Sequence, residues 1–564
     1  MILQALCAYY ERNIDLPRPG FETKGIPFVI EIDSRGKVVQ IEDTRTTYGK
    51  RRNPRNFLVP QGMKKTSGIA ANLLWDNTEY VLGVTLNGKV ERVKEQHAAF
   101  RARFEQFCLG VDDAGLNAIG QFFATGDRIR LEADSLWPEI LETNPVLTFR
   151  LNGDLELICQ RPAVRHVLAN PIDSDTTQIT CLVAGASDSL ERLHTSIKGV
   201  RGAQTSGANI VSFNKEAFNS FAKEQGRNAP VGKHAAFAYT TALNYLLSNE
   251  SGQRIQVGDA STVFWSERQT ELEDIFGDLF DEPFKDDPTK QTKAVEALFN
   301  SPKTGVFTDN SDDALFYVLG LAPNAARISI RFWLVSTVSE MSARIRQHFD
   351  DLRMIKPSFE KPHLSLFTLL TCTAVQGKSE NITPNLVGEF MRAILAGLPY
   401  PTTLLQAVIR RIRAQREVTY PRAALIKAYL NRQVRYLQSQ EGKITVSLDE
   451  SNNNAGYLIG RLFATLEKVQ EEAVNPSTTI RDRFYGAASS TPVTVFANLM
   501  KLKNHHLAKL EDGRKRYFEK LIGQIISGIT DFPAHLSLAD QGRFAIGYYH
   551  QRQAFFTKSN KQGE

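Results

Sequence analysis

The spacing of apolar residues changes once along this chain of 564 residues, close to Pro357 and Pro362. Before these prolines, apolar and polar residues alternate in short runs such as FVIEID and KVVQIED, which flank the turn Ser34-Arg35-Gly36 as hairpin strands do. After them, apolar residues recur every three or four positions, as in amphipathic helices. The sequence therefore predicts an α+β fold, with a mixed α/β N-terminal region that contains antiparallel hairpins and an all-α C-terminal helical bundle.

Several segments of the N-terminal region have a predicted secondary structure of their own. A short helix is expected at the N-terminus, and helices are expected over 91–123. A second hairpin is predicted in VLTFRL-NGD-LELICQ, because Asn152-Gly153 stands between two alternating runs. ITCLVAG and NIVSFN are predicted strands, and residues 327–354 are predicted to form a strand followed by a long helix.

The length of the chain predicts about two to four domains, because one hydrophobic core does not serve so many residues. The expected division is a mixed α/β region over 1–356 with a basic arm over 44–65, a basic helical region over 357–441, and the bundle over 446–564. The segment 442–454 is rich in Ser and Asn and reads as a linker. The bundle carries its own apolar stripes, and its length suffices to bury a core.

Composition and motifs argue against several classes of protein. The five cysteines lie far apart without a CxxC pair, so neither a zinc site nor a disulfide framework is expected. The N-terminus lacks the basic lead and cleavage site of an export signal, and no run of 18 apolar residues occurs, which predicts a cytoplasmic protein. No HExxH, GxSxG or Cys/His pairing is present, so no catalytic residue, metal or cofactor is predicted.

The stretch most informative for function is a basic arm followed by a mixed polar and apolar motif. From Thr44 to Met63 the chain has five Arg and Lys residues and no acidic one, which predicts a mobile arm. The central motif that follows, KKTSGIAANLLWDNTEYVLG (64–83), combines lysines and short polar residues with apolar anchors. Lys and Arg neutralise phosphates, whereas Asn and hydroxyl side chains can reach base edges. The candidates for binding duplex DNA are Arg51, Arg52, Lys64, Lys65, Thr66, Ser67, and the base readers Asn72 and Asn77.

The alternative for this stretch is a solvated basic loop that runs into an ordinary core strand. A second candidate contact is the glycine loop KGVRGAQTSGAN (198–209), since Gly-rich backbone can come close to phosphates. Its candidate residues are Lys198, Arg201, Gln204 and Asn209. The loop could also pack against the central motif or be merely structural, and it does not match the P-loop pattern GxxxxGK[ST].

A third basic region lies in the helical part of the chain. Residues 404–437 contain eight Arg and Lys residues and one acid, Glu417. On a helix, Leu404, Leu405, Val408, Ile409 and Ile412 share one side. The opposite side carries Arg410, Arg411 and Arg413, and Arg416 follows them as a further candidate. A repeated arginine face without an aromatic or amide reading set favours contact with a nucleic acid strand.

The charge balance reverses between Glu267 and Asp313, where thirteen acidic residues face five basic ones. Clustered carboxylates over 271–287 could bind two metal ions in a nuclease. No His stands at ligand spacing, however, and the acids alternate at helical intervals with Leu272, Ile275, Phe276, Leu279 and Phe280. A solvated helix face is the favoured interpretation, and a metal-dependent nuclease is the alternative.

The central motif, together with KGVRGAQTSGANIVSFN (198–214) and KEQGRNAPVGKHAAFAYTTALNYLL (223–247), resembles the large subunit of the type I-C CRISPR interference complex, the Dvulg subtype of Cascade. The resemblance extends from MILQALCAYYER to the last helices. It implies a non-catalytic subunit that recognises the protospacer-adjacent motif in duplex DNA, assists R-loop formation, holds the non-target strand and helps recruit the helicase-nuclease. The implied partners are the crRNA-bearing backbone subunits, the crRNA-processing subunit, target double-stranded DNA and the helicase-nuclease.

The resemblance also implies a small subunit translated from the C-terminal part of the same gene by internal initiation. No methionine lies between Met391 and Met500, and Met500 would cut through a predicted helix. A non-AUG start at Val446, in the linker, is the first choice, and Met391 is the alternative.

Overall fold

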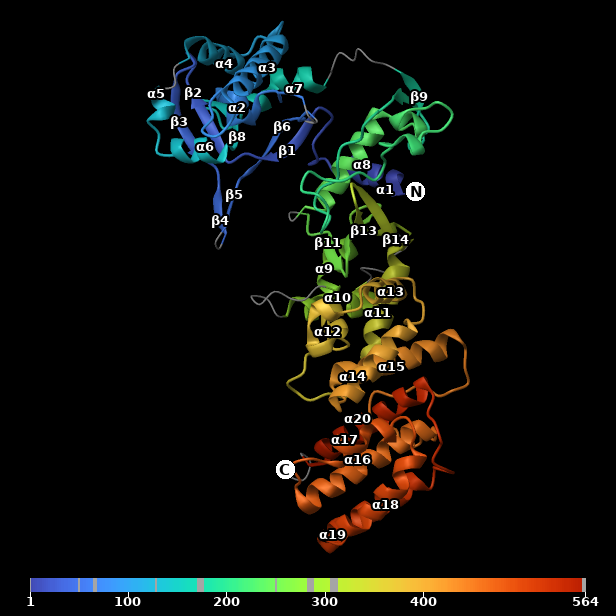
Figure 1. The fold of residues 1–564 in the computed structure, drawn as a ribbon. Helices are drawn as coiled ribbons and strands as arrows, with labels where there is room; N and C mark the ends of the chain where they lie inside the picture. Colours follow the sequence, from blue (N-terminus) through green and yellow to red (C-terminus); the bar gives the residue numbers. More distant parts are fainter. Residues whose placement is uncertain are drawn as a thin grey trace. The chain divides into compact units, whose positions relative to one another are not determined.

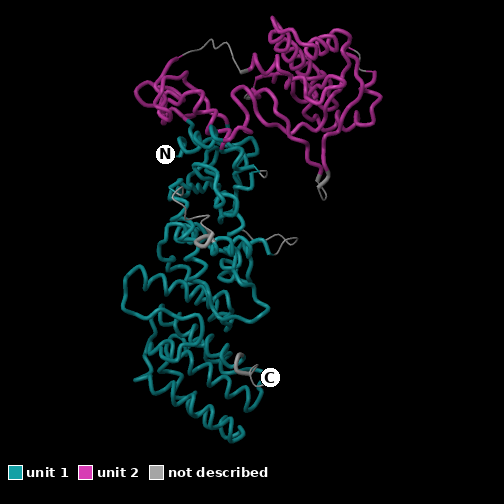
Figure 2. Tube along the Cα trace, turned by 180° about the vertical axis from the view of Figure 1, so that it is seen from behind, with its two compact units in different colours: residues 1–12, 196–212, 243–564 teal, residues 13–195, 213–242 magenta. Residues whose placement is uncertain are grey.

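The computed structural model describes residues 2–48, 51–63, 68–126, 129–169, 177–248, 251–280, 289–304 and 313–559. The chain divides into two compact units (Figure 2). Unit 1 consists of residues 1–12, 196–212 and 243–564, and unit 2 consists of residues 13–195 and 213–242. The N-terminal helix and the glycine loop therefore belong to the same unit as the C-terminal helices, whereas the central motif belongs to unit 2.

Unit 2 is built on a four-stranded mixed sheet in the order β3-β2-β8-β7 (Figure 1). β2 pairs antiparallel with β3 and parallel with β8, and β7 pairs antiparallel with β8. All five residues of β2 are buried, as expected for a central strand. The strand bounds are β2 Phe28–Ile32, β3 Val38–Asp43, β7 Trp75–Asn77 and β8 Val146–Leu151.

Helices cover this sheet and complete the core of unit 2. Helix α4 contacts both β2 and β8, and the rings of Phe122 and Phe149 are 5.4 Å apart. The Asp113 carboxylate caps α4 by accepting from the N–H groups of Gly115 and Leu116, which fixes where the helix begins. The helix bounds are α2 Thr78–Leu82, α3 Val90–Cys108, α4 Ala114–Thr125, α5 Ile129–Glu132, α6 Trp137–Thr143 and α7 Pro162–Ala169.

The first predicted hairpin is confirmed as β2–β3, but the second is wrong. Strand β8 forms, yet its partners are β2 and β7, and after the turn at Asn152-Gly153 only an isolated bridge joins Arg150 to Leu157. Ile158–Gln160 is a single 3-10 turn. The residues from Leu157 to Cys159 are all buried, so this run packs into the core as a block instead of alternating between two faces.

The remaining strands of unit 2 form three two-stranded ribbons. They are β1 Phe21–Gly25 with β6 Asn56–Pro60, β4 Thr46–Tyr48 with β5 Arg51–Asn53, and β9 Gln178–Thr180 with β10 Ser187–Ser189, all antiparallel. The arm that was predicted to be mobile thus contains three strands. ITCLVAG contributes only the short β9, and the predicted strand NIVSFN is wrong, since it makes a single bridge from Asn209 to Arg327. Helix α8, Lys233–Leu246, follows.

Unit 1 contains an antiparallel sheet in the order β11-β12-β13-β14, with β11 Arg254–Val257, β12 Ala260–Ser266, β13 Leu315–Asn324 and β14 Arg327–Thr337. The predicted strand and helix over 327–354 are confirmed, because Thr337 ends β14 and caps α11 by accepting from Glu340 N–H at 3.2 Å. The helices of this part are α1 Ile2–Arg12, α9 Glu271–Phe280, α10 Lys290–Thr304 and α11 Val338–Leu352.

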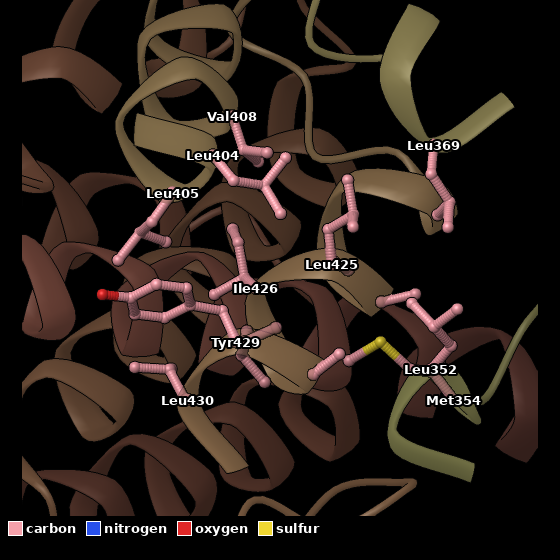
Figure 3. Close-up of a cluster of buried hydrophobic side chains, with 14 of the residues drawn as sticks. Leu352, Met354, Leu369, Leu404, Leu405, Val408, Leu425, Ile426, Tyr429 and Leu430 are labelled. Atoms are coloured by element: carbon pink, nitrogen blue, oxygen red, sulfur yellow. The ribbon is translucent and has the colours of Figure 1, made fainter. Parts of the chain in front are cut away.

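The chain beyond Pro357 is helical, as predicted. One continuous core joins α11 to the later helices, and Figure 3 shows part of it, where Leu352 and Leu369 lie near side chains of α14 and α15. The bounds are α12 Leu366–Thr371, α13 Pro384–Leu395, α14 Thr402–Gln415, α15 Tyr420–Tyr436, α16 Ala455–Val474, α17 Ile480–Ala488, α18 Val493–Leu507, α19 Asp512–Ile526 and α20 Leu538–Ser559. Among the described residues, no helix combines the length and apolarity that crossing a membrane requires.

Helix α20 packs closely on two sides. A Cβ added at Gly460 of α16 would lie 2.1 Å from the Phe544 carbonyl oxygen of α20, so only glycine permits this approach. On another side, a Cβ at Gly542 would lie 3.0 Å from Ile426 of α15. The bundle over 446–559 is therefore continuous with α14 and α15 through α20.

Candidate nucleic-acid interface

The central motif is held at its base by one buried asparagine. The backbone N–H of Met63 donates to Asn72 Oδ1 at 2.9 Å, and the N–H of Asn72 donates to Asp76 Oδ2 at 2.9 Å. Asn72 is only 5% exposed and Asp76 only 3%. Met63 and Asn72, which lie on either side of the segment 64–67, are thus tied to each other and to Asp76 of β7.

Side chains distant in sequence hold the same region. Arg103 of α3 donates from Nη1 to the Ala71 carbonyl at 2.7 Å, and burial lowers the pKa of this arginine. Trp75 donates from Nε1 to the Pro60 carbonyl at 2.7 Å, and the Lys24 ammonium lies 5.5 Å from the centre of its ring. These contacts hold β6 and β7, the strands that precede and follow the segment 64–67. No local pattern in the sequence indicates the role of Arg103, because its partner is 32 residues away.

Asn77 has a structural contact as well. Its Oδ1 accepts from the N–H of Tyr80 at 3.3 Å, which makes it the N-cap of α2. The helix ends after one turn at Gly83, whose left-handed backbone closes a bond to the Glu79 carbonyl. The apolar anchors of the motif are buried as predicted: Leu73, Leu74, Trp75, Tyr80, Val81 and Leu82.

The basic candidates of the motif and arm have different surroundings. Lys64, Lys65, Thr66 and Ser67 lie outside the described residues. Arg51 and Arg52 both lie in β5, where Arg51 pairs through its backbone with Tyr48 and the side chain of Arg52 is exposed. Arg55 is also exposed, with its guanidinium 5.1 Å from the ring of Phe57.

Arg45, at the start of the arm, is engaged inside the protein. Its guanidinium donates to Asp43 at 2.7 Å and to Glu139, and it lies 4.5 Å from the ring of Phe28. The hydrogen bonds to the two carboxylates raise the pKa of Arg45 further above its ordinary value. Among the arm side chains that the structure describes, the cations presented to solvent are therefore Arg52 and Arg55.

The glycine loop is closed on itself within unit 1. Ile197 and Ala208 exchange backbone hydrogen bonds of 2.8 and 2.9 Å, and Gly207 has φ of 93°, a conformation that favours glycine. The N–H of Arg201 donates to Ser261 Oγ of β12 at 2.9 Å. Three candidate side chains of the loop are exposed, Lys198, Arg201 and Gln204, and Asn209 is partly buried.

Helix α14 has the two faces that its sequence predicts. Leu404, Leu405, Val408, Ile409 and Ile412 are buried. Arg410, Arg413 and Arg416 are exposed, and Arg411 is half-buried. Arg416 ends the helix in a left-handed conformation, with its N–H bonded to the Ile412 carbonyl. A short arginine ladder of these four residues is thus the basic surface of α14.

The basic residues of α15 turn inward instead. Arg432 and Arg435 reach Asp351 of α11 at 3.4 and 2.5 Å, and Lys427 donates to the Asp351 carbonyl at 2.8 Å. Arg422 donates to the Cys372 carbonyl at 3.1 Å. Burial lowers the pKa of both Lys427 and Arg422. The basic surface predicted from the composition of 404–437 is therefore limited to α14. The cations of α15 instead bind groups of α11 and the carbonyl that follows α12.

The acidic region forms helix α9 with its apolar side buried. Glu273 accepts from Ser266 Oγ and from Arg12 Nη2, both at 2.5 Å, and Asp278 pairs with Lys290 at 2.8 Å. Asp281, Asp286 and Asp287 lie outside the described residues. Within the ranges described, no three His, Cys, Asp or Glu side chains gather as a metal site would need. Glu273 and Asp278 of α9 therefore form ion pairs with Arg12 and Lys290.

Comparison with known proteins identifies the family of the chain. No curated protein sequence matches it significantly. The protein family described as CRISPR-associated protein (Cas_Csd1) matches residues 6–556, which is nearly the whole chain and includes the central motif, the glycine loop and α14. The chain therefore belongs to the Csd1 family of CRISPR-associated proteins.

Proposed function

We propose that this protein is the non-catalytic large subunit of a type I-C Cascade surveillance complex, and that unit 2 recognises the protospacer-adjacent motif in duplex DNA. Family membership supports a CRISPR-associated large subunit. The observation that supports DNA binding is the hydrogen bond from the Met63 N–H to Asn72 Oδ1. Between these two residues lie Lys64, Lys65, Thr66 and Ser67. Lys side chains neutralise phosphates, and short polar side chains can reach base edges.

In this proposal the residues of the interface have separate roles. Lys64, Lys65, Arg51 and Arg52 contact phosphates, and Thr66 and Ser67 read base edges. Asn72 and Asn77 were first predicted to read bases, but the protein already engages both side-chain oxygens. We assign them to positioning: Asn72 holds the loop, and Asn77 starts the helix behind it.

The arginine ladder of α14 is proposed to hold the displaced non-target strand. Arg410, Arg413 and Arg416 are exposed on one helix and have no ion pair among those found in the described residues. Cations without a protein partner neutralise phosphates at no cost of breaking internal salt bridges. The glycine loop, with Lys198 and Arg201 exposed, is a second proposed contact to nucleic acid.

The proposed partners are the crRNA-bearing backbone subunits, the crRNA-processing subunit and the helicase-nuclease that degrades the target. A small subunit made from the C-terminal part of the same gene is also proposed. The close packing of α16 on α20 supports this, although their apolar core continues into α15. The protein itself is proposed to have no cleavage activity.

The proposed function is tested with the assembled complex and target duplexes that differ only in the adjacent motif. A clear preference for one motif, lost when Lys64, Lys65, Thr66 and Ser67 are replaced together by a Gly/Ser segment, is expected. Equal binding of all motifs by the unaltered complex would contradict it. Cleavage of DNA by the purified protein with magnesium or manganese, abolished by Asp278→Asn or Asp281→Asn, would instead establish a nuclease.

A further inference from the structure

A loop of unit 2 exposes an aromatic side chain that the proposed interface does not use. The loop connects residue 214 to residue 230, and the side chain of Phe221 within it is 93% exposed. Phe218, three residues earlier, is 37% exposed. Single exposed apolar residues are common on protein surfaces. The backbone of this loop, however, distinguishes Phe221 from the others.

Phe221 and its neighbour adopt a conformation that side chains disfavour. The φ angles of Phe221 and Ala222 are 52° and 54°, and that of Gln225 is 47°. In this left-handed region the Cβ atom crowds the backbone, so Gly and Asn are the residues that usually occupy it. Two such residues in succession, neither of them Gly or Asn, persist only where surrounding structure holds them, and such strain concentrates at functional sites.

The holding structure is the side chain of Asn228. Its Oδ1 accepts from the N–H of Ser220 at 2.9 Å. Its Nδ2 faces three acceptors, Asn219 Oδ1 at 3.2 Å and the carbonyls of Lys223 and Gln225, each at 3.0 Å. One amide therefore binds the loop on both sides of Phe221 and fixes the position from which the ring projects.

The base of the loop is fixed as well. Gly226 is buried, and a Cβ there would lie 2.5 Å from the Glu191 carbonyl oxygen. The Arg192 guanidinium donates from Nε and Nη2 to Gln225 Oε1 at 3.2 and 3.0 Å. Phe221 is therefore an exposed ring on a loop held by several hydrogen bonds, which lowers the ordering cost when a ligand binds.

The charges around the ring favour a nucleic acid over an apolar protein surface. Lys215, Lys223 and Arg227 are exposed on the loop, against two exposed acids, Glu216 and Glu224. Arg192 at the base adds a further cation. Single-stranded nucleic acids are bound by aromatic rings that stack on bases, beside cations that follow the backbone.

We propose that Phe221 is a base-stacking residue that packs its ring against an unpaired base of the bound DNA. The inference rests on the proposed function, because it requires that the complex opens a target duplex. It adds a contact that neither the central motif nor α14 supplies. Asn228 is the positioning residue for this contact, since it acts on the DNA only through the loop.

The test measures binding of the assembled complex to a target duplex with a pre-opened protospacer. Phe221→Ala is expected to weaken binding about 5- to 100-fold, the range that follows from the loss of one base–aromatic stack. Phe221→Trp should retain binding. Asn228→Ala should shift affinity in the same direction as Phe221→Ala although the ring is kept. Leu155→Ala is the matched control, because Leu155 is 98% exposed in the same unit and should leave binding unchanged.

A photoreactive benzoyl-phenylalanine at position 221 identifies what the ring touches. A crosslink to DNA supports the proposal, and a crosslink to a protein subunit overturns it. Unchanged affinity of Phe221→Ala for open DNA, in a complex that still prefers the correct motif, also overturns it. If the unaltered complex has no motif preference, the proposed function fails independently of Phe221, so the two failures are distinguishable.

Discussion

Asn72 Oδ1 accepts the backbone N–H of Met63 at 2.9 Å, from a side chain that is only 5% exposed. A buried amide thus closes the base of the segment 64–67. The same residue donates its own N–H to Asp76, which also accepts from the N–H of Asn77 at 2.8 Å. The DNA-binding candidates of the central motif therefore depend on a hydrogen-bond network that also begins β7.

The first prediction concerns Asn72→Ala. Removal of the amide leaves the Met63 N–H without its acceptor, which should lower the free energy of unfolding by about 1–3 kcal/mol. Because Asn72 holds the end of a segment that carries both the proposed phosphate contacts and the proposed base readers, DNA affinity should fall, and more on the correct motif than on an incorrect one. Denaturant unfolding of the protein and binding of the assembled complex to both motifs measure the two effects.

Asn77→Ala serves as the control for this prediction. Loss of the N-cap should cost about 1 kcal/mol of stability without opening the base of the loop, so DNA binding should change little. A loss of affinity for the correct motif without any loss of stability in Asn72→Ala would show that Asn72 reads a base.

The second prediction compares the arginines of α14 with those of α15. Arg410→Ala, Arg411→Ala and Arg413→Ala combined should impair duplex opening, seen by permanganate footprinting of the displaced strand, and leave motif preference intact. Each lost phosphate contact should reduce the dependence of log K on log salt by about 0.7 for a single strand. Protein stability should hardly change, because these side chains are on the surface.

Arg432→Ala, in α15, should instead lower the stability of the protein. It leaves Asp351 paired with Arg435, but it removes one buried partner of Asp351 and the donor to the Ala393 and Leu398 carbonyls, which should cost about 1–3 kcal/mol of stability. An unchanged footprint in the α14 variant, with normal stability, would indicate that its arginines face another component of the complex.

The third prediction is a dependence of stability on pH. Burial lowers the pKa of His348 to about 3 and that of His550 to about 4, whereas an unfolded histidine titrates near 6.5. Between these values the unfolded chain binds more protons than the folded one. The free energy of unfolding should therefore be greatest above pH 6.5 and fall as the pH is lowered toward 4.

His550→Asn measures the share of one histidine in this effect. For His550 the loss between pH 7 and pH 5 should be about 2 kcal/mol. Urea unfolding at the two pH values should give a smaller difference in the variant than in the unaltered protein. An equal difference in both would mean that His550 is not protonated on unfolding.

The fourth prediction concerns the start of the proposed small subunit. Val446 accepts the N–H of Ile355 at 2.9 Å, and α20 packs on α15 through Gly542. A product that begins at Val446 would lack α14 and α15 and expose this apolar side of α20, whereas a product from Met391 would keep it covered. Intact-mass analysis of complex purified from the full gene alone distinguishes the two. The absence of any internal product would contradict the proposal.

Much of the fold could be predicted because it depends on local periodicity. The change near Pro357, the β2–β3 hairpin and the buried face of α14 all follow from spacing within a few residues. The hairpin at Asn152-Gly153 was predicted by the same logic and fails, since Leu157, Ile158 and Cys159 pack together into a core that other segments supply. Turn residues predict where the chain reverses, but tertiary packing decides which strands pair, here β8 with β2 and β7.

The sequence by itself determined the family resemblance, the α+β order of elements and the amphipathic face of α14. Only the tertiary structure decided which cations are available: the charges of α15 bind Asp351, about eighty positions earlier in the chain, and Arg45 binds Glu139. It likewise decided that Asn72 holds a loop and that Phe221 stands exposed on a strained one. The physical reason is that helix spacing is local, whereas the partner of a buried polar group depends on how distant segments pack.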